Sequence, residues 1–374
     1  MPRTTSASTL GVLVALAVWG LPLPARSIPV FARQYGVTCG KCHAVIPRLN
    51  EFGAGFLASG DRIPGVNPGP TIPVSTKFNL VGSSANQGNG PGGAGLPREI
   101  VDEVEAFVAG GVGSRASYLV EQYVVDGGMP GQTRDAWVTD RLNPWQARIP
   151  LSVQAGSFSL PLPVDPETFR ETYAGYGLFD QTIGDNPFNF FDPKVGVHLS
   201  VGNTLHGSSV QFVASQGHDR QSGLPATGTD LMAIAQDAVG PLTLSLYRYE
   251  GTRPVPGALD RFERTGVGVV FNDWRRWTSE TVLQTGWDSQ CSALAARGCA
   301  SSGGFTQLRY AFNRRFFALG RYEGTSDSTG GFARDAELLA GYAPLERTRI
   351  TLEDVVQHVP ATTNTMNLQF TVAF

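Results

Sequence analysis

Apolar and polar residues alternate with a period of two at the C-terminal end of the chain, which finishes on an aromatic residue. Period two is the pattern of a β-strand with one apolar face. A terminal strand of this kind that ends in Phe resembles the last strand of bacterial outer-membrane barrels, and a half-buried strand of a soluble sandwich, which has the same period, is the alternative. One face carries Met366, Leu368, Phe370, Val372 and Phe374, and the other carries Asn367, Gln369, Thr371 and Ala373.

The same alternation recurs upstream and predicts sixteen strands. An even number is expected for a single-chain bacterial barrel, and the pattern also accommodates fourteen or eighteen strands. The predicted fold class is an all-β transmembrane barrel of about sixteen antiparallel strands, with a small N-terminal helical segment acting as a plug. The predicted strands are 72–83, 98–110, 115–125, 132–141, 146–158, 193–202, 207–216, 228–237, 240–250, 261–271, 276–287, 303–312, 315–325, 333–342, 347–358 and 364–374.

Short and long connections alternate between these strands. If residue 374 faces the periplasm, the short set is periplasmic and the long Gly- and Asp-rich set is extracellular, as in outer-membrane barrels. The predicted outer connections include 251–260 and 359–363. The longest, 159–192, carries many aromatic side chains that need burial. We expect this connection to fold into the lumen, and docking on the outer rim or on another protein is the alternative.

The first residues of the chain predict export. A positive charge at Arg3, an apolar run over 10–21 and the small residues around Ala25-Arg26-Ser27 form a signal peptide, residues 1–27. A membrane anchor is the alternative, but the run is too short to span a bilayer as a helix. In an exported protein we expect a disulfide between Cys291 and Cys299, which share one predicted outer loop, and two thiols are the alternative.

Composition narrows the function classes. The formal net charge is only −3, and the basic residues are scattered among the acidic ones, so a nucleic-acid surface is excluded. Mean hydropathy is near zero, which soluble proteins and transmembrane barrels share, so the alternation decides between them. The sequence shows no Ser-His-Asp set and no Gly-rich phosphate loop that would indicate hydrolysis or group transfer.

A C-G-K-C-H motif follows the signal peptide and predicts one covalently bound haem c. Cys39 and Cys42 would attach the haem, and His43 would bind its iron from one face. A disulfide, a redox dithiol or half of a zinc site are the alternatives. Zinc requires a second pair of ligands, and the other two cysteines lie far downstream.

Residues 28–70 form the predicted monohaem cytochrome c segment, and 71–374 form the porin-like barrel. Leu49, Phe52 and Phe56 are expected to share a helical face and to pack on the haem edge, although an ordinary helix core gives the same pattern. A segment this short rarely folds alone. Because a sixteen-stranded barrel has a wide lumen, we expect the segment to sit in or against its periplasmic mouth.

The chain resembles the fused monohaem cytochrome c–porins of the bacterial outer membrane, including the iron-oxidising members. The resemblance rests on the stretch from Phe31 to His43, on Pro47-Arg48-Leu49-Asn50-Glu51-Phe52-Gly53, and on the barrel that ends in Phe374. It implies electron transfer between an extracellular donor, such as Fe(II), and a periplasmic carrier such as a soluble cytochrome. The donor itself is not specified by these residues.

A second axial ligand for the haem iron is missing from the predicted haem segment, which contains no Met and no second His. His198 is the candidate from the barrel, because its predicted strand directs it into the lumen; a solvated histidine or an open iron site are the alternatives. Charged side chains that are expected to face the lumen could guide a metal cation or keep the pore hydrated. They are Glu103, Glu105, Glu121, Asp135, Arg148, Arg321, Arg349 and Glu353.

The sequence therefore predicts an outer-membrane electron conduit, surrounded by lipid, with its haem in the periplasmic mouth or lumen of the barrel. Two alternatives remain at this stage. One is a transport porin with a structural or gating haem plug, and the other is a haem enzyme that acts at an open iron site.

Overall fold

The computed structural model describes residues 30–70, 72–84, 101–216, 228–290, 298–328, 330–359 and 361–374. The predicted signal peptide lies outside the described residues. Within the described part, no helix combines the length and apolar character needed to cross a membrane.

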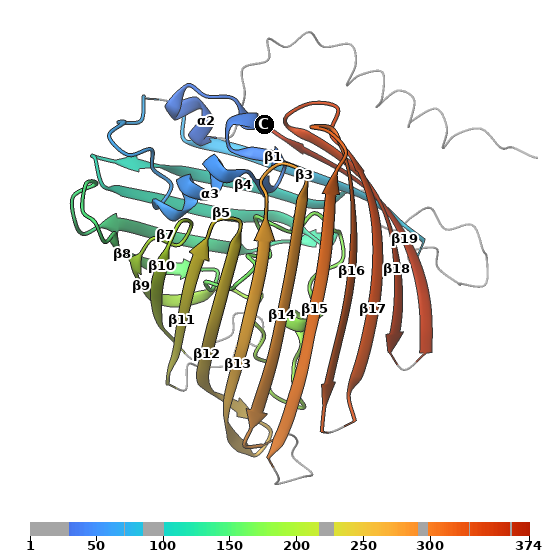
Figure 1. Ribbon diagram of the computed structural model, residues 1–374. Helices are drawn as coiled ribbons and strands as arrows, with labels where there is room; N and C mark the ends of the chain where they lie inside the picture. Colours follow the sequence, from blue (N-terminus) through green and yellow to red (C-terminus); the bar gives the residue numbers. More distant parts are fainter. Residues whose placement is uncertain are drawn as a thin grey trace, which may run out of the picture.

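A closed antiparallel barrel forms the body of the molecule (Figure 1). Among the described residues, seventeen strand segments enter the ring, and one of them, β6 (Met129–Pro130), is only a two-residue piece beside the neighbouring hairpin. The other sixteen are full strands, and the last pairs with the first to close the ring. The predicted fold class is confirmed. The sixteen are β3 (Val74–Ser83), β4 (Val101–Val112), β5 (Ala116–Asp126), β7 (Thr133–Arg141), β8 (Leu151–Phe158), β9 (Lys194–Gly202), β10 (Ser208–Gln216), β11 (Thr229–Val239), β12 (Leu242–Val255), β13 (Ala258–Asn272), β14 (Trp277–Asp288), β15 (Cys299–Ala311), β16 (Phe316–Asp327), β17 (Phe332–Tyr342), β18 (Thr348–Val359) and β19 (Ala361–Ala373).

Side chains along the wall alternate between an apolar outer face and a polar inner face. On β19, Leu368 is 54% exposed, whereas the adjacent Gln369 is 4% exposed. On β10, Phe212 is exposed and its neighbour Gln211 is buried. A soluble sandwich buries its apolar face, so the opposite arrangement here is that of a barrel with lipid outside and polar side chains inside.

Strand boundaries differ most from the prediction at two places in the barrel. β8 begins at Leu151 and not at 146, because Pro150 has no backbone N–H to donate to a ladder. Arg148, expected in the lumen, is therefore exposed in the preceding connection. Strands β12 and β13 also extend through most of the predicted outer loop 251–260 and leave a tight turn, in which Gly257 adopts a φ of +76°.

The N-terminal segment, residues 30–70, lies at the end of the barrel where the connections are short and the C-terminus is found (Figure 1). It contains α2 (Val30–Tyr35), the 3₁₀ turn η1 (Cys39–Lys41), the small sheet of β1 (His43–Val45) and β2 (Arg48–Leu49), and α3 (Glu51–Ala58).

Hydrogen bonds to the wall hold this segment in the mouth of the barrel. The Ser117 hydroxyl donates to the Gly60 carbonyl at 2.6 Å, and an Arg62 Nη donates to the Gly113 carbonyl at 2.7 Å. The Gln34 amide donates to the Ala109 carbonyl at 3.0 Å. The segment therefore docks at the short-turn mouth.

The long connection 159–192 folds into the lumen, as expected. Four of its aromatic side chains are at most 3% exposed, and they pack on aromatic side chains of the inner wall. Ring centroids of Phe188 and Tyr249 are 4.5 Å apart, and those of Tyr176 and Phe305 are 4.7 Å apart. The connection contains the short helix α4 (Gly177–Asp180). The four side chains are Tyr176, Phe179, Phe188 and Phe190.

Cys299, the first residue of β15, is disulfide-bonded and 3% exposed. It packs against Ile183 of the inward-folded connection. Its expected partner, Cys291, lies outside the described residues.

Candidate functional site

The Asn50 side chain links the C-G-K-C-H motif to the following helix. Its amide nitrogen donates to the carbonyls of Gly40 and Lys41 at 3.2 and 3.1 Å, and its amide oxygen accepts from the backbone N–H of Gly53 at 3.0 Å. The last bond caps the N-terminus of α3, a role for which Asn is strongly preferred. Asn50 therefore couples the loop between the cysteines to the start of the helix.

Gly53 allows α3 to approach the motif closely. A Cβ at this position would lie 2.0 Å from the Cys42 carbonyl oxygen, which also accepts a backbone hydrogen bond from Asn50 at 2.8 Å. Only glycine fits between the helix and the loop. The stretch after the motif, singled out in the sequence, thus has a local structural role.

His43 has the hydrogen bonding expected of an iron ligand. Its Nδ1 lies 2.9 Å from the Pro47 carbonyl oxygen, and a ligating histidine commonly donates its second ring N–H to such a carbonyl. With the proton on Nδ1, Nε2 is the nitrogen that would bind iron. Burial lowers the pKa of His43, which favours the neutral imidazole that metal binding requires.

A cavity of about 610 Å³ opens beside the motif and is lined by Cys39, Cys42 and His43. This volume lies within the range of about 300–1,000 Å³ found for ligand sites. Both cysteines are thiols, and burial raises the pKa of Cys42 to about 11, so it stays a neutral thiol. Phe31 and Phe56 add an apolar edge, with ring centroids 5.1 Å apart. These residues fit a covalently attached haem.

Two of the three predicted haem contacts reach this cavity. Leu49 and Phe56 line it. Phe52 is not among the described lining residues, and its ring instead packs under the Lys41 Nζ at 4.4 Å. Because the Asn50 cap makes α3 begin at Glu51, Leu49 precedes the helix, and the expected common helical face does not form.

His198, the candidate distal ligand, lines the same cavity from β9. Its Nε2 lies 2.9 Å from the Gln211 side-chain oxygen, and its Nδ1 lies 3.2 Å from the Gln154 side-chain oxygen. Both ring nitrogens thus face glutamine side chains of the neighbouring strands, and one of these bonds would have to break before the ring could bind iron.

Arg48 ties the N-terminal segment to the interior of the barrel. Its guanidinium is buried and lies 2.9 Å from a Glu280 carboxylate oxygen on β14 and 3.8 Å from Glu171 of the inward-folded connection. Glu171 in turn pairs with Arg309 of β15 at 2.5 Å. Sequence analysis gave Arg48 no role, since neither partner lies near it in the chain.

Asp61 adds a buried carboxyl group to the cavity wall. It is 7% exposed, and burial raises its pKa to about 7. Near neutral pH this group therefore changes charge beside the haem motif.

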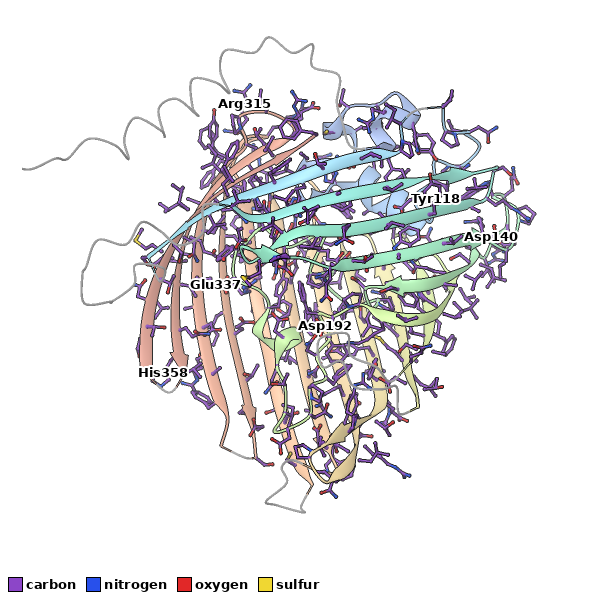
Figure 2. All side chains as sticks on the ribbon, turned by 180° about the vertical axis from the view of Figure 1, so that it is seen from behind. Tyr118, Asp140, Asp192, Arg315, Glu337 and His358 are labelled. Carbon is purple, nitrogen blue, oxygen red and sulfur yellow. The ribbon has the colours of Figure 1, made fainter. Side chains whose placement is uncertain are left out.

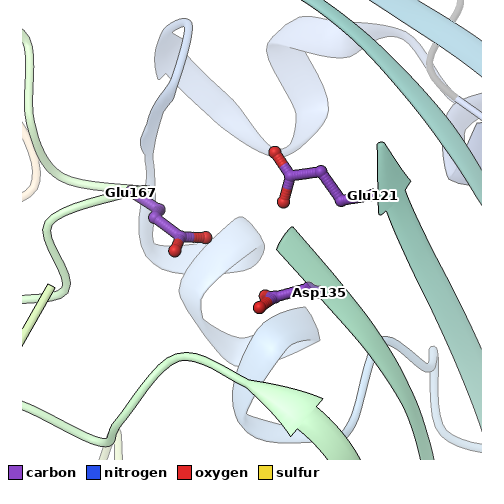
Figure 3. A group of neighbouring side chains, drawn as sticks. All are labelled: Glu121, Asp135 and Glu167. Carbon is purple, nitrogen blue, oxygen red and sulfur yellow. The ribbon is translucent and has the colours of Figure 1, made fainter. Parts of the chain in front are cut away.

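Three further carboxylates line the cavity together. Glu121 of β5, Asp135 of β7 and Glu167 of the inward-folded connection each offer an oxygen, and these oxygens lie within 4.8 Å of one another (Figure 3). We call these residues the carboxylate triad. The sequence indicated Glu121 and Asp135 as lumen charges but gave no sign that Glu167 would meet them.

No known family model matches the chain, and no curated protein matches it. Solved structures of outer-membrane porins share its fold. OmpF of Salmonella typhi is 11% identical with a TM-score of 0.59, and the match covers 80% of this chain and 97% of OmpF. The anion-selective porin of Comamonas acidovorans is 13% identical with a TM-score of 0.56 and the same coverage.

The outer-membrane channel DcaP of Acinetobacter baumannii is 11% identical with a TM-score of 0.54, and the match covers 83% of this chain and all of that one. These likenesses define the class of fold, a porin-type closed β-barrel.

Proposed function

We propose that the protein is an outer-membrane c-type cytochrome fused to a porin-type barrel, which moves electrons between an extracellular donor, such as Fe(II), and a periplasmic carrier. The observation that carries the proposal is that Cys39, Cys42 and His43 line one cavity in the mouth of a barrel with an apolar outer wall. When bound there, haem c supplies one-electron oxidation and reduction.

The contents of the lumen support passage of electrons and not of large solutes. The N-terminal segment docks in one mouth, and the connection 159–192 packs its aromatic side chains against the inner wall. Arg48 and Glu171 join these two parts through buried charges. Packing of this kind favours a lumen that is narrow for solutes, with the C-G-K-C-H motif near one mouth of the barrel.

Arginines around the short-turn mouth favour an acidic carrier. Arg275, Arg276, Arg314 and Arg315 are exposed on turns at this end of the barrel, and Figure 2 shows Arg315 near the N-terminal segment. Positive charge at a docking face accelerates association with a negatively charged partner and is screened by salt. We expect reduction of an acidic soluble cytochrome to slow as the ionic strength rises.

The test is electron transfer into proteoliposomes that enclose an oxidised soluble cytochrome, with Fe(II) added outside. Wild-type protein is expected to reduce the enclosed cytochrome, and His43→Ala is expected to abolish this. His358→Ala is the matched control, because His358 is exposed at the opposite end of the barrel (Figure 2). Equal transfer by wild type and His43→Ala contradicts the proposal.

A solute porin with a structural or gating haem plug is the second candidate, and the fold itself favours it, since the similar solved structures are porins. The two functions separate in a flux measurement on the same vesicles. Rapid efflux of small solutes that does not depend on the redox state of the haem supports the porin, and vesicles that retain solutes while transferring electrons support the conduit.

A further inference from the structure

The three residues of the carboxylate triad come from three separate parts of the chain (Figure 3). Glu121 and Asp135 project inward from the paired strands β5 and β7, and Glu167 reaches them from the inward-folded connection. Oxygens bound to one divalent ion at about 2.1–2.5 Å lie up to about 4–5 Å apart. The observed limit of 4.8 Å therefore fits one shared ion.

Glu121 is a buried carboxylate that the protein leaves unpaired. It is 7% exposed, and no described residue gives its carboxylate a hydrogen bond or an ion pair. The strand register between β5 and β7 shifts between Val120 and Gln122, and Figure 3 shows the Glu121 side chain directed at the other two carboxylates. Buried carboxyl groups in proteins are paired, protonated or bound to metal ions. The convergence of Glu121 on two further carboxylates beside a cavity points to a metal ion.

One member of the triad is paired with an arginine. The Arg134 guanidinium contacts Oε1 of Glu167 through Nε and Nη2, at 2.8 and 2.6 Å, and this oxygen also accepts from the Ser159 hydroxyl. Nη2 of Arg134 also donates to the Phe191 carbonyl at 3.1 Å. Within the described residues, Oε2 of Glu167 accepts no hydrogen bond. Arg134 therefore contacts one member of the triad, Glu167, whereas Glu121 has no described partner.

The nearest lysine pairs with a different carboxylate. Lys77 pairs with Glu105 at 2.5 Å, so its positive charge is already matched. Glu103 next to it accepts from the Asn79 amide and adds further negative charge on the same side. Lys77 therefore leaves Glu121 open to a cation from solution.

We infer that the carboxylate triad is a binding site for a divalent first-row cation, and that it takes up the metal-ion electron donor. Carboxylate oxygens are hard ligands that suit such ions, and the triad lines the same cavity as the C-G-K-C-H motif. The assignment of the ion as donor rests on the proposed function, whereas cation binding itself does not.

The binding test uses Mn²⁺ as the probe and follows free Mn²⁺ by electron paramagnetic resonance during titration of the full chain in detergent. Wild type is expected to bind one ion, and Glu121→Gln and Asp135→Asn are each expected to weaken binding about tenfold or more. Glu353→Gln is the matched control, because Glu353 is another buried lumen carboxylate and its replacement can still accept from the N–H groups of Tyr173 and Ala174.

Heat-modifiable gel migration confirms that each variant has a folded barrel. Absence of Mn²⁺ binding to wild type, or equal binding by both triad variants and wild type, overturns the inference, since the carboxylates would then share protons in place of a metal. Loss of binding in Glu353→Gln to the same extent also overturns it, because the site would then lie elsewhere in the lumen.

The donor role is tested on the same proteins by the dependence of haem reduction on Fe(II) concentration. Both triad variants are expected to need about tenfold more Fe(II) for the same rate, with reduction by dithionite unchanged. An unchanged Fe(II) dependence overturns the donor assignment. Wild type that binds Mn²⁺ at the triad but accepts no electron from Fe(II) refutes the proposed function and leaves the cation site standing.

Discussion

On the side of the lumen from β12 to β16, buried arginines are paired with carboxylates. Arg264 contacts both oxygens of Asp288, at 2.8 and 3.0 Å, and Arg321 pairs with Glu337. On the side formed by β5 and β7, the three carboxylates of the triad lie together; Arg134 pairs with Glu167, and Glu121 has no described partner. The lumen therefore has a neutralised side and an acidic side.

The neutralised side also anchors the inward-folded connection. Arg309 pairs with Glu171, and Arg321 donates to the Ala174 carbonyl at 3.0 Å. Buried ion pairs suit a rigid interior, whereas a carboxylate without a described partner beside a cavity suits a ligand. Positive and negative lumen residues look evenly mixed along the sequence. In space, the ion pairs on one side of the lumen have a structural role, and the triad on the other side has the proposed binding role.

The largest effect is expected from Arg48→Met, which leaves Glu171 and Glu280 without this partner. Removal of one member of a buried ion pair costs about 3–5 kcal/mol. We expect residues 30–70 to detach from the mouth and to become sensitive to limited proteolysis. Arg48→Lys keeps the charge and is the control; a protease-resistant segment in Arg48→Met would show that these pairs do not hold it.

Neutralising a carboxylate is expected to change the free energy of unfolding in opposite directions on the two sides of the lumen. Asp288→Asn leaves Arg264 buried without a counter-charge and is expected to lower the free energy of unfolding by about 3 kcal/mol. In metal-free protein, Glu121→Gln relieves repulsion and is expected to raise it by about 1 kcal/mol, the worth of one pKa unit. Unfolding by guanidinium in detergent measures both free-energy changes. Changes of the same sign would refute the distinction between the two sides of the lumen.

A smaller effect is expected from Asn50→Ala, at the junction of the haem motif and α3. It removes the helix cap and two hydrogen bonds to the motif, with a cost of about 1–2 kcal/mol. Faster hydrogen exchange at the Gly53 amide is the expected readout. Asn50→Asp retains the capping oxygen but not the two donors, so it should restore protection of Gly53 alone; identical exchange in all three proteins would exclude the capping role.

The smallest effect is expected from a change of pH, which acts on the stability of residues 30–70 through Asp61. Because burial raises its folded-state pKa to about 7, the folded protein holds a proton that the unfolded chain has released above pH 4. The stability of the segment should therefore fall as pH rises, by about 1 kcal/mol between pH 6 and pH 7. Asp61→Asn should abolish this slope in proteolysis-rate measurements, and an unchanged slope would assign it to another group.

The barrel was predictable because each strand repeats one local rule, polar inside and apolar outside. All sixteen predicted strands correspond to observed ones, and errors arose where proline or strand extension overrides the rule, as at Pro150 and in the hairpin around Gly257. The C-G-K-C-H motif was equally readable, since its residues are contiguous, and haem attachment to it stays a prediction. The expected common helical face of Leu49, Phe52 and Phe56 does not form, because the Asn50 cap makes α3 begin after Leu49, which apolar spacing alone does not reveal.

The carboxylate triad and the Arg48 pairs could not be predicted from the sequence. Glu167 meets Glu121 and Asp135 only because the connection 159–192 folds inward, and Arg48 reaches Glu280 across the lumen. These contacts depend on tertiary placement and not on local pattern. A chain of alternating strands indicates which side chains face inward but not which of them meet.

Measurement of covalent haem in the purified, denatured protein tests the central claim most directly. Pyridine haemochrome spectra with protein quantitation are expected to give one covalently attached haem per chain for wild type and none for Cys39→Ser/Cys42→Ser, with both barrels folded beforehand. Wild type without attached haem, or equal haem in the double variant, would contradict the account.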